Sequence, residues 1–257
     1  MSRSDPPALD LPPPPRLRAA DIALFLDVDG TLLEIEREPG AVHVPDELCR
    51  VLGQLQTATG GALALVSGRS LDQLDRLFSP LRLNAAGLHG LERRNRSQVT
   101  RAAPKPAILA RARERLSEFA AATAGVLLED KGLTLALHYR NAPAAAAAAL
   151  AVAEAAVAES GGALDLLRGK MVCELKPPGA DKGQAIAAFM AEPPFVGRRP
   201  VFAGDDVTDE AGFATINDLG GISIRIGGAS PTAATFGHRD VTAVQTWLLE
   251  LLEAEAA

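Results

Sequence analysis

The chain has 257 residues, of which 47% are hydrophobic and 23% charged, as is ordinary for a folded protein with one or two cores. The formal net charge is −6 and no basic stripe is present, which argues against a nucleic-acid-binding protein. No apolar run reaches the ~18 residues of a membrane span, and the N-terminus lacks the apolar core of a signal peptide. The cysteines Cys49 and Cys173 lack metal-ligand spacing and indicate free thiols in a reducing compartment. We therefore expect a cytoplasmic monomer that binds neither membranes nor nucleic acid.

The first segment, residues 1–20, contains the run Pro12 to Pro15 and is predicted to be a disordered tail. Beyond it, short apolar runs predict buried strands of a parallel sheet. Helical patterns with one apolar face separate several of these runs. The alternation predicts an α/β fold with a Rossmann-like, doubly wound parallel sheet as its core, formed by residues 21–103 and 179–257. The predicted strands cover residues 22–26, 63–66, 83–86, 200–203 and 222–226, and the helices cover residues 45–57, 71–78 and 181–190.

The middle of the chain departs from this alternation of predicted strands and helices. An arginine-rich stretch from Arg93 to Arg101 lacks interleaved aromatic residues and is interpreted as a solvated loop. Residues 104–178 then predict an α+β cap domain inserted into the core, with prolines at both ends that suit two hinges. Its predicted elements are a helix at 105–122, a hairpin at 126–129 and 133–139, an alanine-rich helix at 144–159, and a hairpin at 164–167 and 171–174.

The motif Asp27-Val28-Asp29-Gly30-Thr31 directly follows the first predicted strand. Ligands of open α/β sheets bind beyond the carboxyl ends of the strands, where this motif would lie. Two carboxylates pointing into one pocket repel each other unless a cation joins them, and carboxylate oxygens favour Mg²⁺. An ordinary Asp-Gly turn is the alternative reading of the motif taken alone.

A second acidic motif, Gly204-Asp205-Asp206-Val207-Thr208-Asp209-Glu210, follows the strand at 200–203. Asp205 stands at the strand end and is the better candidate for a metal ligand. Asp209 and Glu210 are also compatible with a capped helix start, because acids stabilise the first turn of a helix.

Two shorter motifs complete the set. Ser67-Gly68-Arg69 ends the strand at 63–66, where a hydroxyl and backbone N–H groups could hold a phosphate oxygen. Lys182, at a helix start, opposes the helix dipole but would be well placed beside aspartates and a phosphate. Each motif is weak alone. Together they supply a nucleophile, an acid/base, phosphate donors and a cation site, which suit the hydrolysis of a phosphate monoester.

From about residue 21 to residue 250 the sequence resembles the haloacid dehalogenase superfamily of phosphatases, on these four motifs. The resemblance implies that Asp27 attacks phosphorus and that Asp29 serves as the general acid and base. It also implies a Mg²⁺ ion held by Asp27, the backbone carbonyl of Asp29, and Asp205.

The resemblance assigns further roles around the transferred phosphoryl group. Ser67, Gly68 and Lys182 would bind it, and Lys182 would count among the catalytic residues. Asp206 and Asp209 would hold the metal site and Lys182 in position without binding the phosphoryl group themselves.

Further polar residues make the chain similar to the trehalose-6-phosphate phosphatase family. The sequences that carry this similarity are Gly87-Leu88-His89-Gly90, Glu129-Asp130-Lys131, His138-Tyr139-Arg140 and Gly169-Lys170-Met171-Val172-Cys173-Glu174. The implied substrate-binding residues are His89, Glu129, Lys131, Arg140, Lys170 and Glu174, because paired carboxylates and cations suit the many hydroxyls of a disaccharide. Family members often carry Tyr where Val28 stands.

Other functions remain open at this point. The cap residues alone decide between trehalose 6-phosphate and another sugar phosphate, such as sucrose phosphate, glucosylglycerol phosphate or mannosylglycerate phosphate. A phospho-receiver signalling module also phosphorylates an aspartate with Mg²⁺, but it is shorter and has no cap. A catalytically silent binding subunit is disfavoured by Asp27, Asp29, Lys182 and Asp205.

Overall fold

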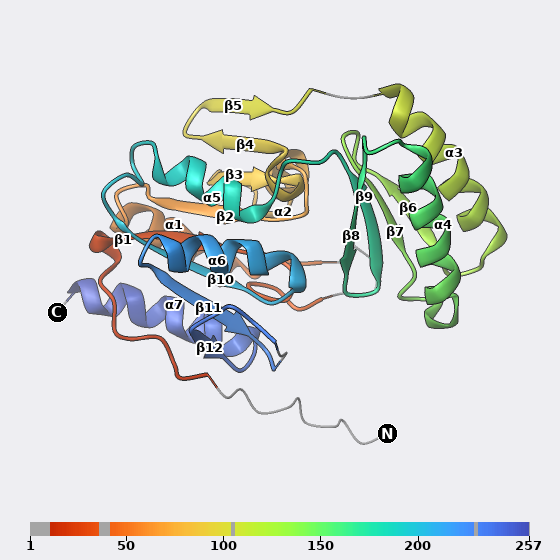
Figure 1. The fold of residues 1–257 in the computed structure, drawn as a ribbon. Coiled ribbons are helices and arrows are strands. Elements are labelled where there is room, and N and C mark those ends of the chain that lie inside the picture. Colours follow the sequence, from red (N-terminus) through yellow and green to blue (C-terminus); the bar gives the residue numbers. More distant parts are fainter. Residues whose placement is uncertain (1–10, 36–41, 104–105, 229–230, 257) are drawn as a thin grey trace, which may run out of the picture. The chain divides into compact units, whose positions relative to one another are not determined.

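The computed structural model describes residues 11–35, 42–103, 106–228 and 231–256 (Figure 1). The chain divides into two compact units, one formed by Met1–Thr100 with Asp181–Ala257 and the other by Arg101–Ala180. Within the described part of the chain, no helix is both long enough and apolar enough to cross a membrane.

The first unit is built on an eight-stranded sheet with the strand order β12-β11-β10-β1-β2-β3-β4-β5. The strands from β12 to β3 pair in parallel, and β4 pairs antiparallel with β3. This confirms the predicted parallel sheet and the α/β class. The strands are β1 (Ile22–Leu26), β2 (Leu63–Val66), β3 (Asn84–Gly87), β4 (Glu92–Asn95), β5 (Gln98–Arg101), β10 (Arg199–Gly204), β11 (Ile222–Ile226) and β12 (Phe236–His238).

Helices cover both faces of this sheet, which explains why its central strands are apolar along their whole length. Successive side chains of β1 alternate between the faces. Ile22, Leu24 and Leu26 join the cluster with α1 (Asp46–Ala58), α2 (Leu71–Leu77) and α7 (Val241–Ala256). Ala23 and Phe25 join the cluster with α5 (Lys182–Met190) and α6 (Glu210–Asp218).

The arginine-rich stretch is only in part the solvated loop that we predicted, because Arg96 and Arg101 are exposed but Arg94 is buried in a strand. Residues 92–101 form strands β4 and β5, and the side chain of Arg94 is only 3% exposed. Its guanidinium donates to Asp75 at 2.6 and 2.8 Å and to the carbonyl of Leu83. An arginine is buried when a carboxylate and a carbonyl satisfy its donors, and neither partner is adjacent to Arg94 in the sequence.

The N-terminal segment also differs from the prediction of a disordered tail over residues 1–20. Residues 1–10 lie outside the described residues, but residues 11–20 pack on the first unit. Ala19 is fully buried, Leu11 and Leu17 contact the two core clusters, and the Pro12 carbonyl accepts a hydrogen bond from Gly237 N at 2.9 Å. Apolar residues on either side of the run Pro12 to Pro15 anchor this segment.

The second unit contains α3 (Pro106–Ala122), β6 (Leu127–Asp130), β7 (Leu135–His138), α4 (Ala146–Glu159), β8 (Asp165–Gly169) and β9 (Val172–Lys176). Its strands form an antiparallel sheet in the order β6-β7-β9-β8. Leu135, Leu137, Cys173 and Leu175 turn one face of this sheet toward the buried side of α3 and α4. Because side chains alternate along a strand, the residues between them turn toward the opposite face.

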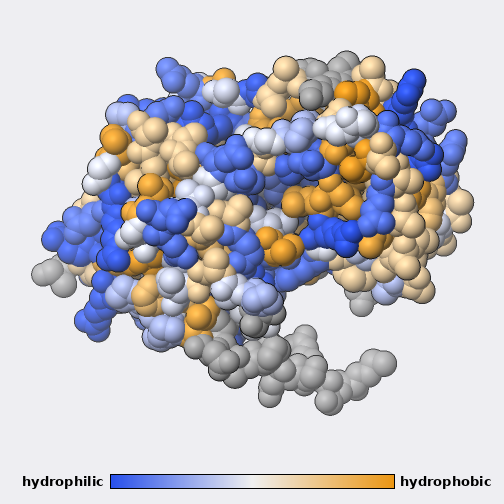
Figure 2. Space-filling view, in the orientation of Figure 1, coloured by the Kyte–Doolittle hydropathy of each residue, from blue (hydrophilic) through white to orange (hydrophobic). Residues whose placement is uncertain are grey.

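Helix α4 owes its form to its composition. Alanine is the strongest helix former, and Ala149, Ala153 and Ala156 bury one side of α4 against the sheet. Ala147 and Ala151 are exposed. Figure 2 accordingly shows pale hydrophobic colour over the surface where α4 lies.

Candidate active site

Three neighbouring strands of the first unit end in polar residues at one edge of the sheet. β1 lies between β10 and β2, and all three run in parallel. Asp27 follows β1, Ser67 follows β2, and Asp205 follows β10. Asp27 N donates to the carbonyl of Ala203 at 2.9 Å, so the strand pairing continues to the first acid. The pairing of the three strands therefore places Asp27, Ser67 and Asp205 at one edge of the sheet.

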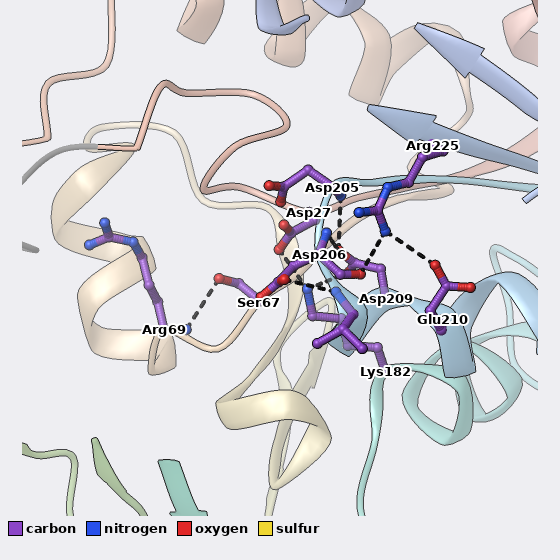
Figure 3. Close-up of polar contacts among 10 residues, drawn as sticks. Asp27, Ser67, Arg69, Lys182, Asp205, Asp206, Asp209, Glu210 and Arg225 are labelled. Carbon is purple, nitrogen blue, oxygen red and sulfur yellow. Dashed lines mark hydrogen bonds and ion pairs between the residues drawn. The ribbon is translucent and has the colours of Figure 1, made fainter. Parts of the chain in front are cut away.

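Lys182 links the two acidic motifs. It begins α5, and its side chain is buried. Its Nζ donates to Asp27 Oδ1 at 2.8 Å and to Asp209 Oδ1 at 2.5 Å (Figure 3). Burial alone would lower the pKa of Lys182, but the carboxylates of Asp209 and Asp27 outweigh it and raise the pKa above its usual value. Lys182 is therefore a permanent cation between two carboxylates.

One lysine does not balance the acids around it. Asp27, Asp205 and Asp209 are all buried and each offers a carboxylate oxygen within 4.8 Å of the others. Burial raises the pKa of Asp27 well above its ordinary value, Lys182 opposes this, and Asp209 and Asp205 raise it further. The excess negative charge favours a hard cation that takes oxygen ligands.

The carboxylate of Asp205 packs directly against the backbone of Gly30. Gly30 has φ +84°, and a Cβ at this position would lie 2.2 Å from Asp205 Oδ2 and 2.7 Å from its Oδ1. Glycine adopts positive φ without strain, and only its lack of a side chain lets Asp205 approach this closely. The three buried carboxylates are a set of oxygen donors that fits a divalent cation.

Asp209 has a structural task that sets it apart from Asp27 and Asp205. Its Oδ2 accepts hydrogen bonds from the backbone N–H groups of Asp205 and Asp206, both at 2.9 Å, and its Oδ1 accepts from Lys182. Asp206 in turn accepts from Val207 N at 2.8 Å and begins the short helix η5 (Val207–Asp209). These contacts fix the conformation of the acidic turn from Asp205 to Asp209.

Asp29 lies in an ion pair that the sequence did not indicate. Arg69 donates from Nε to Asp29 Oδ2 at 2.7 Å and from Nη2 to Asp29 Oδ1 at 2.6 Å. The two residues are 40 positions apart, yet both belong to motifs at strand ends. A guanidinium bound to both oxygens holds the Asp29 side chain in one orientation.

The loop after β2 packs closely against the loop after β3. Ser67 N donates to the Ala86 carbonyl at 2.9 Å, and His89 N donates to the Ser67 carbonyl at 3.0 Å. A Cβ at Gly68 would lie 2.7 Å from His89 Nε2, so a larger residue there would displace the His89 ring. His89 is buried in η3 (Leu88–Gly90), beside the predicted phosphate loop.

The second unit holds a separate polar cluster on the sheet face opposite its helices. Glu129 and Glu174 lie opposite Ala136 on the two neighbouring strands, which places both on that face. Lys131 Nζ donates to Glu174 Oε2 at 3.3 Å, and Thr134 Oγ1 donates to Glu174 Oε1 at 2.6 Å. Both Lys131 and Glu174 are nearly buried, with side-chain exposures of 8% and 6%.

His138 and Arg140 extend this polar face. His138 Nε2 lies 2.9 Å from Glu129 Oε2, and Arg140 Nη2 donates to the Lys170 carbonyl at 3.0 Å. Glu129, Lys131, Glu174, Arg140 and Lys170 therefore belong to one unit, whereas His89 belongs to the other. Thr134 and His138 were not among the predicted substrate-binding residues, although His138 stands in the quoted His138-Tyr139-Arg140 sequence.

Comparison with known proteins gives a consistent result. The trehalose-phosphatase family model matches residues 25–242. A probable trehalose-phosphate phosphatase of Sinorhizobium fredii is 48% identical over 215 residues, covering 84% of this chain and 81% of the relative. Trehalose-6-phosphate phosphatase of Escherichia coli is 46% identical over 231 residues, covering 90% of this chain and 86% of the relative.

Solved structures share the fold. A trehalose-6-phosphate phosphatase related protein is 26% identical with a TM-score of 0.76, over 92% of this chain and all of that one. A phosphatase of the HAD superfamily from Bacteroides thetaiotaomicron has a TM-score of 0.60 at 17% identity, covering 90% and 94% of the two chains. The chain thus has the fold of a phosphatase of the haloacid dehalogenase superfamily and carries acids at the edge of its parallel sheet. It belongs to the trehalose-phosphatase family.

Proposed function

We propose that this chain hydrolyses trehalose 6-phosphate to trehalose and inorganic phosphate, in a reaction that requires Mg²⁺. The observation that carries the proposal is the buried Asp27, bound to Lys182 and beside Asp205 at the end of β1, in a chain of the trehalose-phosphatase family. This arrangement supports a nucleophile, a fixed positive charge and a cation site at one edge of the sheet.

Asp27 and Asp29 divide the covalent chemistry. A carboxylate oxygen of Asp27 attacks phosphorus, the bond to the sugar oxygen breaks, and Asp29 gives that oxygen its proton. Asp29 then takes a proton from water, whose oxygen attacks the phosphorus of the aspartyl phosphate and frees Asp27. Asp29 has to leave its present ion pair with Arg69 to reach the leaving oxygen in the protonated form.

The cation and the phosphate have separate residues. Asp27, Asp205 and the backbone carbonyl of Asp29 would hold Mg²⁺. When bound, the ion offsets the repulsion between the anionic nucleophile and the anionic phosphate. Lys182 holds a phosphoryl oxygen together with Ser67 and the backbone of Gly68. Asp206 and Asp209 keep the acidic turn and Lys182 in position.

The polar face of the second unit selects the sugar. Glu129, Lys131 and Glu174 accept from and donate to the hydroxyls of the distal glucose, while Arg140 and Lys170 serve the phosphate side. His89 contacts the substrate from the first unit. Contacts with the sugar also position the phosphate, so their loss reduces turnover as well as affinity.

The test is phosphate release from a panel of sugar phosphates, with Mg²⁺ and with a chelator. The expected result is preference for trehalose 6-phosphate and loss of activity on chelation. Metal-dependent release from sucrose phosphate or glucosylglycerol phosphate instead would retain Asp27 and its partners and overturn the sugar assignment. A long-lived aspartyl phosphate without release would favour a signalling module.

A further inference from the structure

Strand β11 carries a buried arginine that no catalytic role yet explains. All five residues of β11 are buried, and Arg225 is only 4% exposed. A guanidinium inside a sheet is costly unless it is paired. In the parallel register, Arg225 lies opposite Gly204, the residue directly before Asp205. The strand pairing therefore places this cation next to the acidic turn.

The donors of Arg225 reach the backbone of that turn. Nη1 donates to the carbonyl of Asp206 at 3.1 Å and to Glu210 Oε1 at 3.1 Å (Figure 3). Nε is buried and makes no hydrogen bond. Buried donors are normally all hydrogen-bonded. Because Arg225 leaves one donor unused, the pairing of its own charge does not by itself explain its position beside the turn.

Glu210, which accepts a hydrogen bond from Arg225, also binds a third segment of the chain. Its Oε1 accepts from Thr232 Oγ1 at 2.8 Å and its Oε2 from Ala233 N at 2.7 Å. The turn from Asp205 to Asp209 is therefore held at two points, by Lys182 through Asp209 and by Arg225 through the Asp206 carbonyl. The second point is anchored to the segment that contains Thr232.

We propose that Arg225 is a positioning residue for the cation site. It fixes the peptide that follows Asp205, and its charge offsets part of the repulsion among the acids of the turn. Without it, the turn relaxes and the carboxylate of Asp205 is no longer preorganised for Mg²⁺. This inference rests on the proposed Mg²⁺ site but is independent of which sugar phosphate is the substrate.

The experiment compares Arg225→Met with Arg94→Met by calorimetric titration of the metal-free protein with Mg²⁺. Arg94 is also a buried arginine of the same sheet, but it pairs with Asp75. We expect Arg225→Met to raise the Kd for Mg²⁺ about tenfold and Arg225→Lys to recover most of the affinity, because one ammonium can serve both acceptors. Arg94→Met should lower the melting temperature and leave the Kd unchanged.

Kinetics give a second readout. Arg225→Met should need more Mg²⁺ for half-maximal activity, while its kcat at saturating Mg²⁺ and its KM for the substrate stay close to the wild type. If Arg225→Met does not fold, Glu210→Gln carries the test, with an expected threefold rise in Kd.

Two results would overturn the inference: a Kd for Arg225→Met within twofold of the wild type, or an equal rise in Arg94→Met. Absence of Mg²⁺ binding by the wild type would overturn both this inference and the metal requirement. A wild type that binds Mg²⁺ but does not hydrolyse trehalose 6-phosphate would overturn the proposed sugar and leave the role of Arg225 standing.

Discussion

The two polar clusters of this protein differ in how their charges balance. Around Lys182, three buried carboxylates lie together, and the one ammonium pairs with two of them. In the second unit, Lys131 pairs with Glu174, and Arg140 and Lys170 lie in the same unit as Glu129. The first cluster has an excess of acid and suits a metal ion, whereas the second has cations beside its acids and suits neutral hydroxyl groups. In the proposed function, the first cluster carries the chemistry and the second recognises the sugar.

The largest expected effect tests the first cluster. Asp29→Asn should lower kcat by about 10⁴-fold or more, because an amide can neither give nor take the proton. Phosphate release measures the loss of activity, and thermal unfolding measures whether the fold is retained. The melting temperature should stay within a few degrees of the wild type, as it should for the exposed control Asp46→Asn. Turnover within tenfold of the wild type would rule out Asp29 as the acid and base.

Removing the lysine from each cluster tests the contrast in charge directly. Lys182→Met leaves Asp27 and Asp209 buried without their cation and should cost about 3–5 kcal/mol of unfolding free energy. Lys131→Met leaves only Glu174, which keeps its bond from Thr134, and should cost about 1–3 kcal/mol. Denaturant unfolding of both variants measures the difference. Equal losses would mean that the excess of acid in the first cluster has no energetic consequence.

A smaller effect separates sugar recognition from chemistry. Glu174→Gln should lower kcat/KM for trehalose 6-phosphate about 10–100-fold, because a charged hydrogen bond to a hydroxyl is worth ~1.5–3 kcal/mol. Hydrolysis of p-nitrophenyl phosphate, which has no sugar, should change less than twofold. A parallel loss on both substrates would show that Glu174 acts on the phosphate chemistry or on folding.

The smallest expected effect is on stability at acid pH. The contribution of groups outside the two clusters has to be known before a titration of either cluster is interpreted. Burial lowers the pKa of His238 below 6.5, while Glu250 and Asp240 oppose this shift. The unfolded chain therefore takes up the proton first, and stability falls as the pH drops below about 6.5, by less than ~1 kcal/mol. His238→Gln should remove this part of the pH dependence, as measured by unfolding between pH 7 and pH 5. An unchanged slope would assign the loss to other groups.

Much of the fold could be predicted because buried parallel strands appear in the sequence as short apolar runs. The predictions for residues 22–26, 63–66 and 222–226 match β1, β2 and β11 residue for residue. The acids at the strand ends could be predicted for the same reason, since a strand's end is set by its apolar run. The burial of β4 could not be predicted, because it depends on partners such as Asp75 that only the fold brings near.

Side-chain pairing was the harder part of the site. The ion pair of Arg69 with Asp29 spans 40 positions, and nothing in either motif specifies the other residue. Arg225 could have been found, because a lone arginine within the otherwise uncharged run Ile222–Ile226 requires a buried partner. Such an exception to an apolar pattern is a usable signal of a polar contact inside the sheet.

The close contact between Gly30 and Asp205 has a consequence for evolution. A single methyl group at Gly30 would displace the carboxylate of Asp205 and strain a backbone with φ +84°. A relative with any other residue at this position should therefore keep the fold but lose the cation chemistry. A single substitution at Gly30 would therefore turn a phosphatase into a non-catalytic protein that still binds the sugar phosphate. Such a protein would be one step from serving as a sensor of that ligand.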